Sequence, residues 1–143
     1  MINVISGKDF PIKVIPFIDS AKNSIDIVVF DWRWYPSDPG ATCQLFNHAI
    51  VKAARRGVKV RAIVNNDDIG KALGRNGVEV KRLKTARLVH CKLMIIDDKI
   101  AITGSHNYTQ SAFQMNLELS VIITEDNFEP AFTEFYKNLY SNQ

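Results

Sequence analysis

Apolar and polar positions along the chain follow two spacings, and these predict strands that alternate with helices. Short runs of β-branched residues predict strands, whereas apolar positions three or four residues apart predict helices. The expected strands span residues 24–31, 58–64, 78–80, 88–96, 100–103 and 119–124. The expected helices span 12–21, 42–56, 67–75 and 125–140, with a short helical turn around 108–113. This order predicts an α/β fold, equally described as an α+β sandwich, with a mixed β-sheet flanked by helices.

The first and last predicted helices each have an apolar stripe that we expect to face the core. In the first helix the stripe consists of Ile12, Ile15, Ile18 and Ala21. In the last helix it consists of Phe128, Phe132, Phe135, Tyr136 and Leu139. Residues 32–40 contain two prolines and a glycine, and we expect them to form a loop.

The chain has 143 residues, of which 46% are hydrophobic and 23% are charged. This length and balance predict one globular domain over residues 1–143 and exclude a disordered or low-complexity chain. No run approaches the ~20 apolar residues of a membrane span, and the N-terminus lacks the pattern of a signal peptide. Cys43 and Cys91 form no zinc or disulfide pattern, so we expect a reduced protein in the cytoplasm.

The net charge of +3 conceals an uneven distribution. Residues 52–92 hold twelve basic residues and three acidic ones, a net charge of +9, and the remainder of the chain carries −6. Such a basic block indicates a surface that faces a polyanion. The alternative is that these residues are only the solvated faces of helices and strands.

The residues with the clearest chemical potential lie between positions 90 and 107. Residues two apart in a strand share a face, so His90 and Lys92 should project together. If Asp98-Lys99 forms a two-residue hairpin loop, Lys92 lies opposite Ser105 and His90 opposite Asn107. All four side chains then share one face, whereas a slip of one residue would separate them.

This cluster suits a phosphate group. Lys92, Ser105 and Asn107 offer hydrogen-bond donors to phosphate oxygens, and a neutral imidazole can act as nucleophile or base. No metal site is expected, because His90 has no companion ligands at the required spacing, and we expect no cofactor. Taken singly, each of these residues is more often structural, and only their alignment favours a site.

The segment resembles the signature of the phospholipase D superfamily, His-x-Lys-x4-Asp followed after six residues by Gly-Ser-x-Asn. The match runs from His90 through Asp97 to Asn107 without a gap, and Asn116-Leu117-Glu118 resembles the Asn-x-Glu of small bacterial nuclease-type members. Residues 27–30 and 57–61 also fit the N-terminal half of the family. The resemblance covers nearly the whole chain and implies a phospholipase D-like fold.

The resemblance also implies roles for these residues. His90 is expected to attack phosphorus and form a phosphohistidine, with Lys92, Asn107 and Ser105 holding the phosphate oxygens. Glu118 is expected to hydrogen-bond the far nitrogen of His90 and fix its tautomer. Asp97 should point away from His90, so we expect a supporting hydrogen-bonding role, and a simple turn residue is the alternative.

Larger family members carry the signature twice and pair two histidines, whereas this chain carries it once. His106 should point to the opposite face, and His48 lies mid-helix without a matching motif. The general acid for the leaving group is therefore expected to be His90 of a second subunit. This predicts a two-fold homodimer that shares one active site.

The family's chemistry implies metal-independent cleavage of a phosphodiester, and the basic block favours DNA or RNA as substrate. Trp32, Arg33 and Trp34, with Tyr35 beside them, are candidates for stacking on bases, and packing or a dimer contact is the alternative. One alternative function is a phospholipid phosphodiesterase, although no amphipathic membrane-facing element is evident and no stable membrane association is expected. Another is a catalytically silent nucleic-acid-binding module, which the intact His90, Lys92, Asn107 and Glu118 disfavour.

Overall fold

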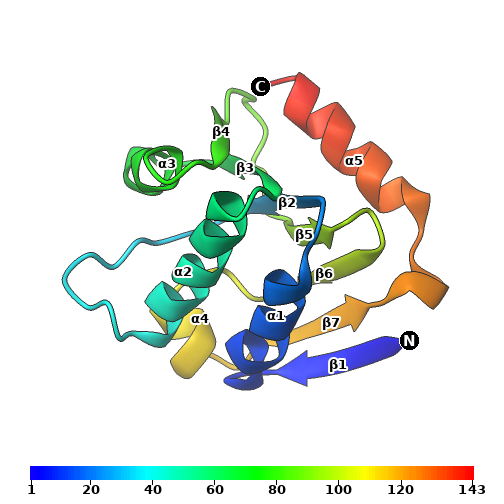
Figure 1. Ribbon diagram of the computed structural model, residues 1–143, viewed down its shortest axis with the longest axis horizontal. Helices are drawn as coiled ribbons and strands as arrows, with labels where there is room; N and C mark the ends of the chain where they lie inside the picture. The colour runs from blue at the N-terminus through cyan, green and yellow to red at the C-terminus, as the bar shows by residue number, and fades with distance from the viewer.

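Seven strands form one mixed β-sheet in the computed structural model, which describes residues 1–143 (Figure 1). The strands are β1 (Ile2–Ser6), β2 (Ser24–Val29), β3 (Lys59–Val64), β4 (Glu79–Arg82), β5 (Lys92–Ile96), β6 (Ile100–Gly104) and β7 (Leu119–Ile123). Their order across the sheet is β1-β7-β6-β5-β2-β3-β4. The pairs β2–β3 and β3–β4 are parallel, and all the other neighbouring pairs are antiparallel. The predicted mixed α/β sheet is therefore confirmed.

Helices cover both faces of this sheet. They are α1 (Asp9–Ser20), α2 (Thr42–Arg55), α3 (Asp67–Gly74), α4 (Gln110–Gln114) and α5 (Pro130–Ser141), with a 3-10 turn, η1 (Glu125–Asn127), before α5. Helices α1 to α4 contribute buried residues to the larger hydrophobic cluster, whereas α5 packs on the smaller cluster across the sheet (Figure 1). Strand β2 faces helices on both sides, which explains why five of its six residues are buried and four are apolar.

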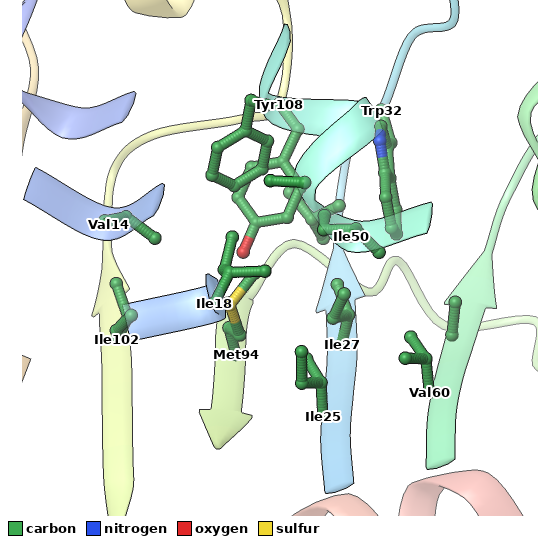
Figure 2. Close-up of a cluster of buried hydrophobic side chains, with 14 of the residues drawn as sticks. Val14, Ile18, Ile25, Ile27, Trp32, Ile50, Val60, Met94, Ile102 and Tyr108 are labelled. Carbon is green, nitrogen blue, oxygen red and sulfur yellow. The ribbon is translucent and has the colours of Figure 1, made fainter. Parts of the chain in front are cut away.

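The larger cluster lies between the sheet and helices α1 and α2. Figure 2 shows Ile25 and Ile27 of β2, Met94 of β5 and Ile102 of β6 beneath Ile18 of α1. Alternation along each strand sends the next residue to the opposite face, where Val28, Leu93 and Ile95 meet α5. Each strand that carries the candidate site is thus anchored by apolar contacts on both faces.

One buried ion pair lies beneath α5. The Asp26 carboxylate, almost fully buried, accepts two hydrogen bonds from the Arg61 guanidinium, at 2.8 and 2.9 Å. The buried Tyr136 hydroxyl of α5 donates towards the carbonyl oxygens of Ile27 and Arg61. These bonds satisfy the polar groups on this side of β2 and β3, so Arg61 is not available to an external ligand.

The N-terminal part of the predicted pattern differs from the structure. The edge strand β1 was not predicted, because it is short and pairs only with β7. Helix α1 begins at Asp9 and buries Phe10, Val14 and Ile18, whereas Ile12 is 69% exposed. Only Ile12 of the predicted stripe was therefore wrong, since Ile18 and Ala21 are buried and Ile15 packs against the core.

The basic block does not form one surface. Arg56 donates to the carbonyl oxygens of Ile18 and Ala21, near the N-terminal end of β2, where Lys59 also lies. Six residues of β2 separate this end from Phe30, a distance of about 17–20 Å. Arg61 is buried in its ion pair, and Lys81 donates to the Tyr140 carbonyl oxygen. A single polyanion-binding face of charge +9, as the sequence suggested, is therefore not present.

None of the helices has both the length and the apolar composition that a membrane crossing needs.

Candidate active site

The hairpin of β5 and β6 carries both halves of the signature, in a register that differs from the predicted one. Leu93 pairs with Thr103 and Ile96 with Ile100, so Lys92 lies beside Gly104 rather than Ser105. The loop has three residues, and Asp97 and Asp98 both have positive φ, at 55° and 52°. The two-residue loop was therefore the wrong prediction, because Asp tolerates the left-handed conformation that the longer loop needs.

The new register brings the signature together at one end of four adjacent strands. Lys92 pairs with Val29 of β2 on one side and lies next to Gly104 of β6 on the other. The Thr103 hydroxyl donates to the Lys92 carbonyl oxygen at 2.7 Å and ties the two strands at this point. Ser105 follows β6, and Glu118 precedes β7, so the polar groups line up across the end of the sheet.

His90 and Lys92 project together, as their spacing predicts. The Lys92 Nζ lies 3.1 Å from Nδ1 and 3.5 Å from Nε2 of His90. An ammonium group can only donate, so the closer Nδ1 accepts and the ring proton is assigned to Nε2. The Phe30 ring lies 4.6 Å from the His90 ring and 5.7 Å from the Lys92 Nζ, and it supports both groups. His90 is exposed and Lys92 is 8% exposed, so a ligand can reach the imidazole from solvent.

The side chain of Asn107 is oriented by the segment that follows β2. Its Oδ1 accepts a hydrogen bond from the Asp31 backbone N–H at 3.0 Å, which leaves the Nδ2 protons free to donate. The two segments are further joined by bonds from Tyr108 N–H to the Asp31 carbonyl oxygen and from Arg33 N–H to the Tyr108 carbonyl oxygen. Asn107 is therefore held rigidly, with its donor groups unpaired.

Ser105 and Glu118 form a separate pair in the chain. The Ser105 hydroxyl donates to Glu118 Oε1 at 2.5 Å, and Asn116 Nδ2 donates to Glu118 Oε2 at 3.1 Å. The expected hydrogen bond from Glu118 to His90 is not present within the chain. Two strand spacings, about 10 Å, separate β7 from β5, which explains why Glu118 turns to the adjacent Ser105.

Gly104 permits the close approach of β6 and β7 at the site. Its φ is +156°, and a Cβ atom at this position would lie 2.3 Å from the Ser120 Oγ and 2.5 Å from the Leu119 carbonyl oxygen. Any side chain here would force the strands apart. The signature thus needs a glycine here, because only a residue without a Cβ atom lets β6 and β7 approach closely enough to place Ser105 next to Glu118.

Asp97 lies at the far end of β5, seven residues from His90, or about 23 Å along an extended chain. Its carboxylate accepts hydrogen bonds from the backbone N–H groups of Lys22, Asn23 and Ser24, at 2.7 to 3.2 Å. Partial burial would raise the pKa of this carboxyl, but the three N–H donors and Lys99 outweigh it and lower the pKa. Asp97 therefore joins the hairpin to the turn between α1 and β2.

The remaining histidines serve packing. His106 is buried, its ring stacks on Phe10 at 4.4 Å, and its nitrogens contact the Ser120 hydroxyl and the Gly7 carbonyl oxygen. Burial lowers the pKa of His106, although the bond to Gly7 and the charge of Glu118 oppose this. His48 is exposed on α2 and stacks against Trp34.

Different environments surround the three loop residues Trp32, Arg33 and Trp34. Trp32 is 1% exposed and donates its indole N–H to Asn47, so its predicted role in substrate stacking was wrong. Apolar packing beneath α2 explains its position. Arg33 is exposed and makes two hydrogen bonds to Asp31, at 2.7 and 3.3 Å, whereas Trp34 is half-buried at the surface.

Two hollows flank this end of the sheet. The first, of about 570 Å³, is bordered by Phe30, Asp31, Trp34, Asn65, Asp67 and Asp68, and we call it the Trp34 hollow. The second, of about 430 Å³, lies between α5 and the segment before β5 and is bordered by Leu88, Val89, His90, Cys91, Phe135 and Leu139. We call it the α5 hollow. The first is mostly polar, and the second is half apolar.

No group of three or more His, Cys, Asp or Glu side chains is arranged to hold a metal ion. The donor set at His90 instead consists of one imidazole, one ammonium and amide N–H groups. Such a set binds an anion rather than a cation.

The family model described as "Cardiolipin synthase, PLD-like domain" matches residues 14–140. The chain belongs to the phospholipase D-like domain family. It is 30% identical over 127 residues to "Phospholipase D" of Rickettsia conorii, covering 85% of this chain and 59% of that protein. It is 27% identical over 135 residues to "Mitochondrial cardiolipin hydrolase" of Chlamydomonas reinhardtii, covering 90% and 56%. The chain thus spans somewhat more than half the length of these curated relatives.

The fold of this phospholipase D-like chain is shared with a solved structure. The phospholipase D family member Nuc from Salmonella typhimurium superposes with a TM-score of 0.76 at 24% identity, covering 99% of this chain and 95% of that one. At this level of identity the likeness shows the fold alone.

Residues outside the signature also shape the site, and the sequence did not single them out. Phe30 packs on His90, Asp31 orients both Asn107 and Arg33, and Thr103 fixes the register of Lys92. The signal available in the sequence was the polar Asp31 directly after the apolar run 27–30. Such a residue lies at a strand end, where functional side chains gather.

Proposed function

We propose that the chain is a phosphodiesterase that cleaves nucleic-acid phosphodiester bonds through a phosphohistidine intermediate and needs no metal. The observation that carries this proposal is the exposed His90 imidazole 3.1 Å from the Lys92 ammonium, beside the unpaired amide donors of Asn107. A nucleophile next to fixed cationic and neutral donors suits attack on a phosphorus whose oxygens gain charge in the transition state.

In the proposed reaction the unprotonated ring nitrogen of His90, Nδ1 in the assigned tautomer, leaves its hydrogen bond to the Lys92 ammonium, attacks phosphorus and forms a P–N bond. The P–O bond to the leaving ester oxygen breaks, and that oxygen takes a proton from the imidazolium of His90 of the partner subunit. Water then attacks the phosphohistidine, gives a proton to the same partner imidazole and frees His90. Lys92 and Asn107 hold the non-bridging oxygens in both steps.

Three features support a shared site in a homodimer. The chain offers one histidine at the site, because His106 is buried and His48 is on α2. Glu118 does not reach His90 within the chain, so the expected hydrogen bond between these two residues would have to form between two copies. Met115 is 83% exposed and Leu117 is 102% exposed beside Glu118, and such apolar side chains at the rim of a site suit a subunit contact.

Nucleic acid is favoured as the substrate by the polar character of the Trp34 hollow and by the remaining basic residues near the site. Lys71, Arg75 and Arg82 lie around α3 and β4, and Arg87 lies in the segment before His90. These cations can pair with successive phosphates along a single strand.

The test is a cleavage assay on single- and double-stranded DNA and RNA in excess EDTA. Wild-type protein should cleave at least one of these substrates, and H90A should be inactive with an unchanged thermal midpoint. Quenching with denaturant at alkaline pH, where the P–N bond is stable, should trap a covalent protein–nucleotide adduct in the wild type alone. Cleavage that requires a divalent metal, or that survives in H90A, would overturn the mechanism.

The α5 hollow favours a second candidate, a phospholipid phosphodiesterase. His90 borders this hollow together with Leu88, which is 74% exposed, and Phe135, which is 49% exposed. An apolar surface next to the nucleophile suits the glycerol and first acyl carbons of a lipid. Two relatives are named for phospholipid hydrolysis. Hydrolysis of cardiolipin vesicles faster than any nucleic acid, and its loss in L88E, would favour this candidate.

A further inference from the structure

The Trp34 hollow opens directly beside the candidate active site. Phe30 forms part of its wall and packs on the His90 ring at 4.6 Å. Asp31 forms another part, and its backbone N–H holds Asn107 at 3.0 Å. Any phosphate bound by His90 and Asn107 therefore has this hollow next to it, within the reach of the adjoining group of the substrate.

The charges around the hollow exclude a phosphate from it. Asp31, Asp67 and Asp68 border it, with Arg33 as the single cation. Arg33 is already bound to Asp31 through two hydrogen bonds, and Asp67 lies 3.3 Å from Arg82. Asp68 has no ion-pair or hydrogen-bond partner. The hollow thus presents a carboxylate without a direct ion-pair partner, which attracts hydrogen-bond donors.

The aromatic wall suits a planar group. The Trp34 indole is half-buried and stacks on His48 with one face, and it also borders a smaller depression lined by Asp68, Lys71 and Arg75. A base that lies against Trp34 would therefore have cations on its far side, where the next phosphate of a strand would lie. Stacking on indole suits any base and gives binding without reading its edge.

The hydrogen-bonding groups of the hollow include amides and carboxylates. The Asn66 side chain caps α3 at Ile69 N–H and donates one N–H to the Trp32 carbonyl oxygen. The Asn65 amide donates one N–H to the Phe30 carbonyl oxygen and keeps both its Oδ1 acceptor and a second N–H. The Asp68 carboxylate can only accept, so it pairs with exocyclic amino groups, as a carboxylate pairs with the amino group of cytosine.

The geometry points to a nucleobase site: the Trp34 hollow binds the base next to the scissile phosphate and selects bases that carry an exocyclic amino group. Cytosine, adenine and guanine have such a donor, whereas thymine and uracil present carbonyl oxygens that Asp68 repels. Trp34 supplies the stacking surface, and Asp68 supplies the selection. This inference rests on the proposed nucleic-acid function and adds a specificity to it.

The test uses single-stranded DNA oligonucleotides of otherwise uniform sequence, with one variable nucleotide on either side of each cleavage position. We expect cytosine and adenine to give cleavage about 3–10-fold faster than thymine at one of these two positions. D68N should reduce this ratio to below about twofold, because an amide can satisfy either kind of base edge. D19N, the same change at an exposed position on α1, is the matched control and should retain the wild-type ratio.

A binding measurement separates this inference from the proposed function. Fluorescence anisotropy with labelled pentanucleotides and the H90A protein should show tighter binding of the cytosine-containing strand than of the thymine-containing strand, and W34A should weaken both.

Cleavage without base preference, with equal binding of both strands, would overturn the base site and leave the nuclease intact. No cleavage and no binding of any strand would overturn both. Faster hydrolysis of choline or ethanolamine lipids that is lost in D68N would assign the hollow to a cationic headgroup instead.

Discussion

The Asp31 backbone N–H donates to the Asn107 side-chain oxygen at 3.0 Å, and this bond aims the amide donors of Asn107 at the site. Asp31 also holds Arg33 through its carboxylate, so one residue orients two polar groups that flank the candidate phosphate position. The segment after β2, which carries no part of the signature, therefore sets the geometry of the signature itself.

This bond predicts different effects for two substitutions of Asn107. N107D keeps the acceptor for Asp31 but removes the donors and adds a negative charge, so activity should fall at least ~100-fold with little change in stability. N107A leaves the Asp31 N–H without a partner and should also cost about 1–3 kcal/mol in the free energy of unfolding. Steady-state cleavage rates and urea denaturation measure the two effects. Equal stability of N107A and wild type would contradict this account of the bond.

The exposed apolar side chains next to Glu118 predict where the two subunits contact each other. L117E should shift the protein from dimer to monomer in size-exclusion chromatography with light scattering, because the contact would then bury an unpaired carboxylate. Activity should fall at least ~10-fold at the same protein concentration. I12E changes a residue that is 69% exposed on α1, and this control should remain dimeric. A wild-type protein that is monomeric and fully active would rule out the shared site.

The Asp97 carboxylate predicts a loss of stability in acid. Its pKa in the folded protein lies below the unfolded value of about 3.9, so its stabilisation is present above pH 4 and is lost as the pH falls through the folded pKa. D97A should cost about 1–3 kcal/mol at pH 7 and clearly less at pH 3. D97N should be milder, because Asn keeps one acceptor and tolerates the positive φ. Urea denaturation at both pH values measures this difference, and turnover near neutral pH should be unchanged in all variants that remain folded.

The buried His106 predicts a second pH dependence, in a higher range. Its folded pKa is lowered mainly by burial, so its contribution to stability is complete above the unfolded value of about 6.5 and declines as the pH falls below it. H106Q should be less stable than wild type at pH 7.5 and should show a smaller decline between pH 7.5 and pH 5. H48Q, at an exposed position on α2, is the control and should follow the wild-type curve. Identical curves for H106Q and wild type would show that His106 does not couple folding to protonation.

Local pattern was sufficient to predict most of the elements. The apolar runs of β2, β3 and β5 and the periodicity of α2 and α5 predicted their positions to within a few residues, since buried strands and amphipathic helices leave strong signals. The spacing of His90 and Lys92 correctly predicted that they project together. The edge strand β1 gave too weak a signal, and the start of α1 was obscured by its exposed Ile12.

The sequence by itself determined which residues gather at one end of a mixed sheet, because alternation and spacing are local properties. Only the tertiary structure decided how they meet. The register of the hairpin depends on a three-residue loop with two left-handed aspartates, and one residue of slip changed the neighbour of Lys92 from Ser105 to Gly104. The burial of Trp32, the anchoring of Asn107 by Asp31 and the turn of Glu118 towards Ser105 likewise depend on strands and loops that are distant in sequence, so no local pattern could specify them.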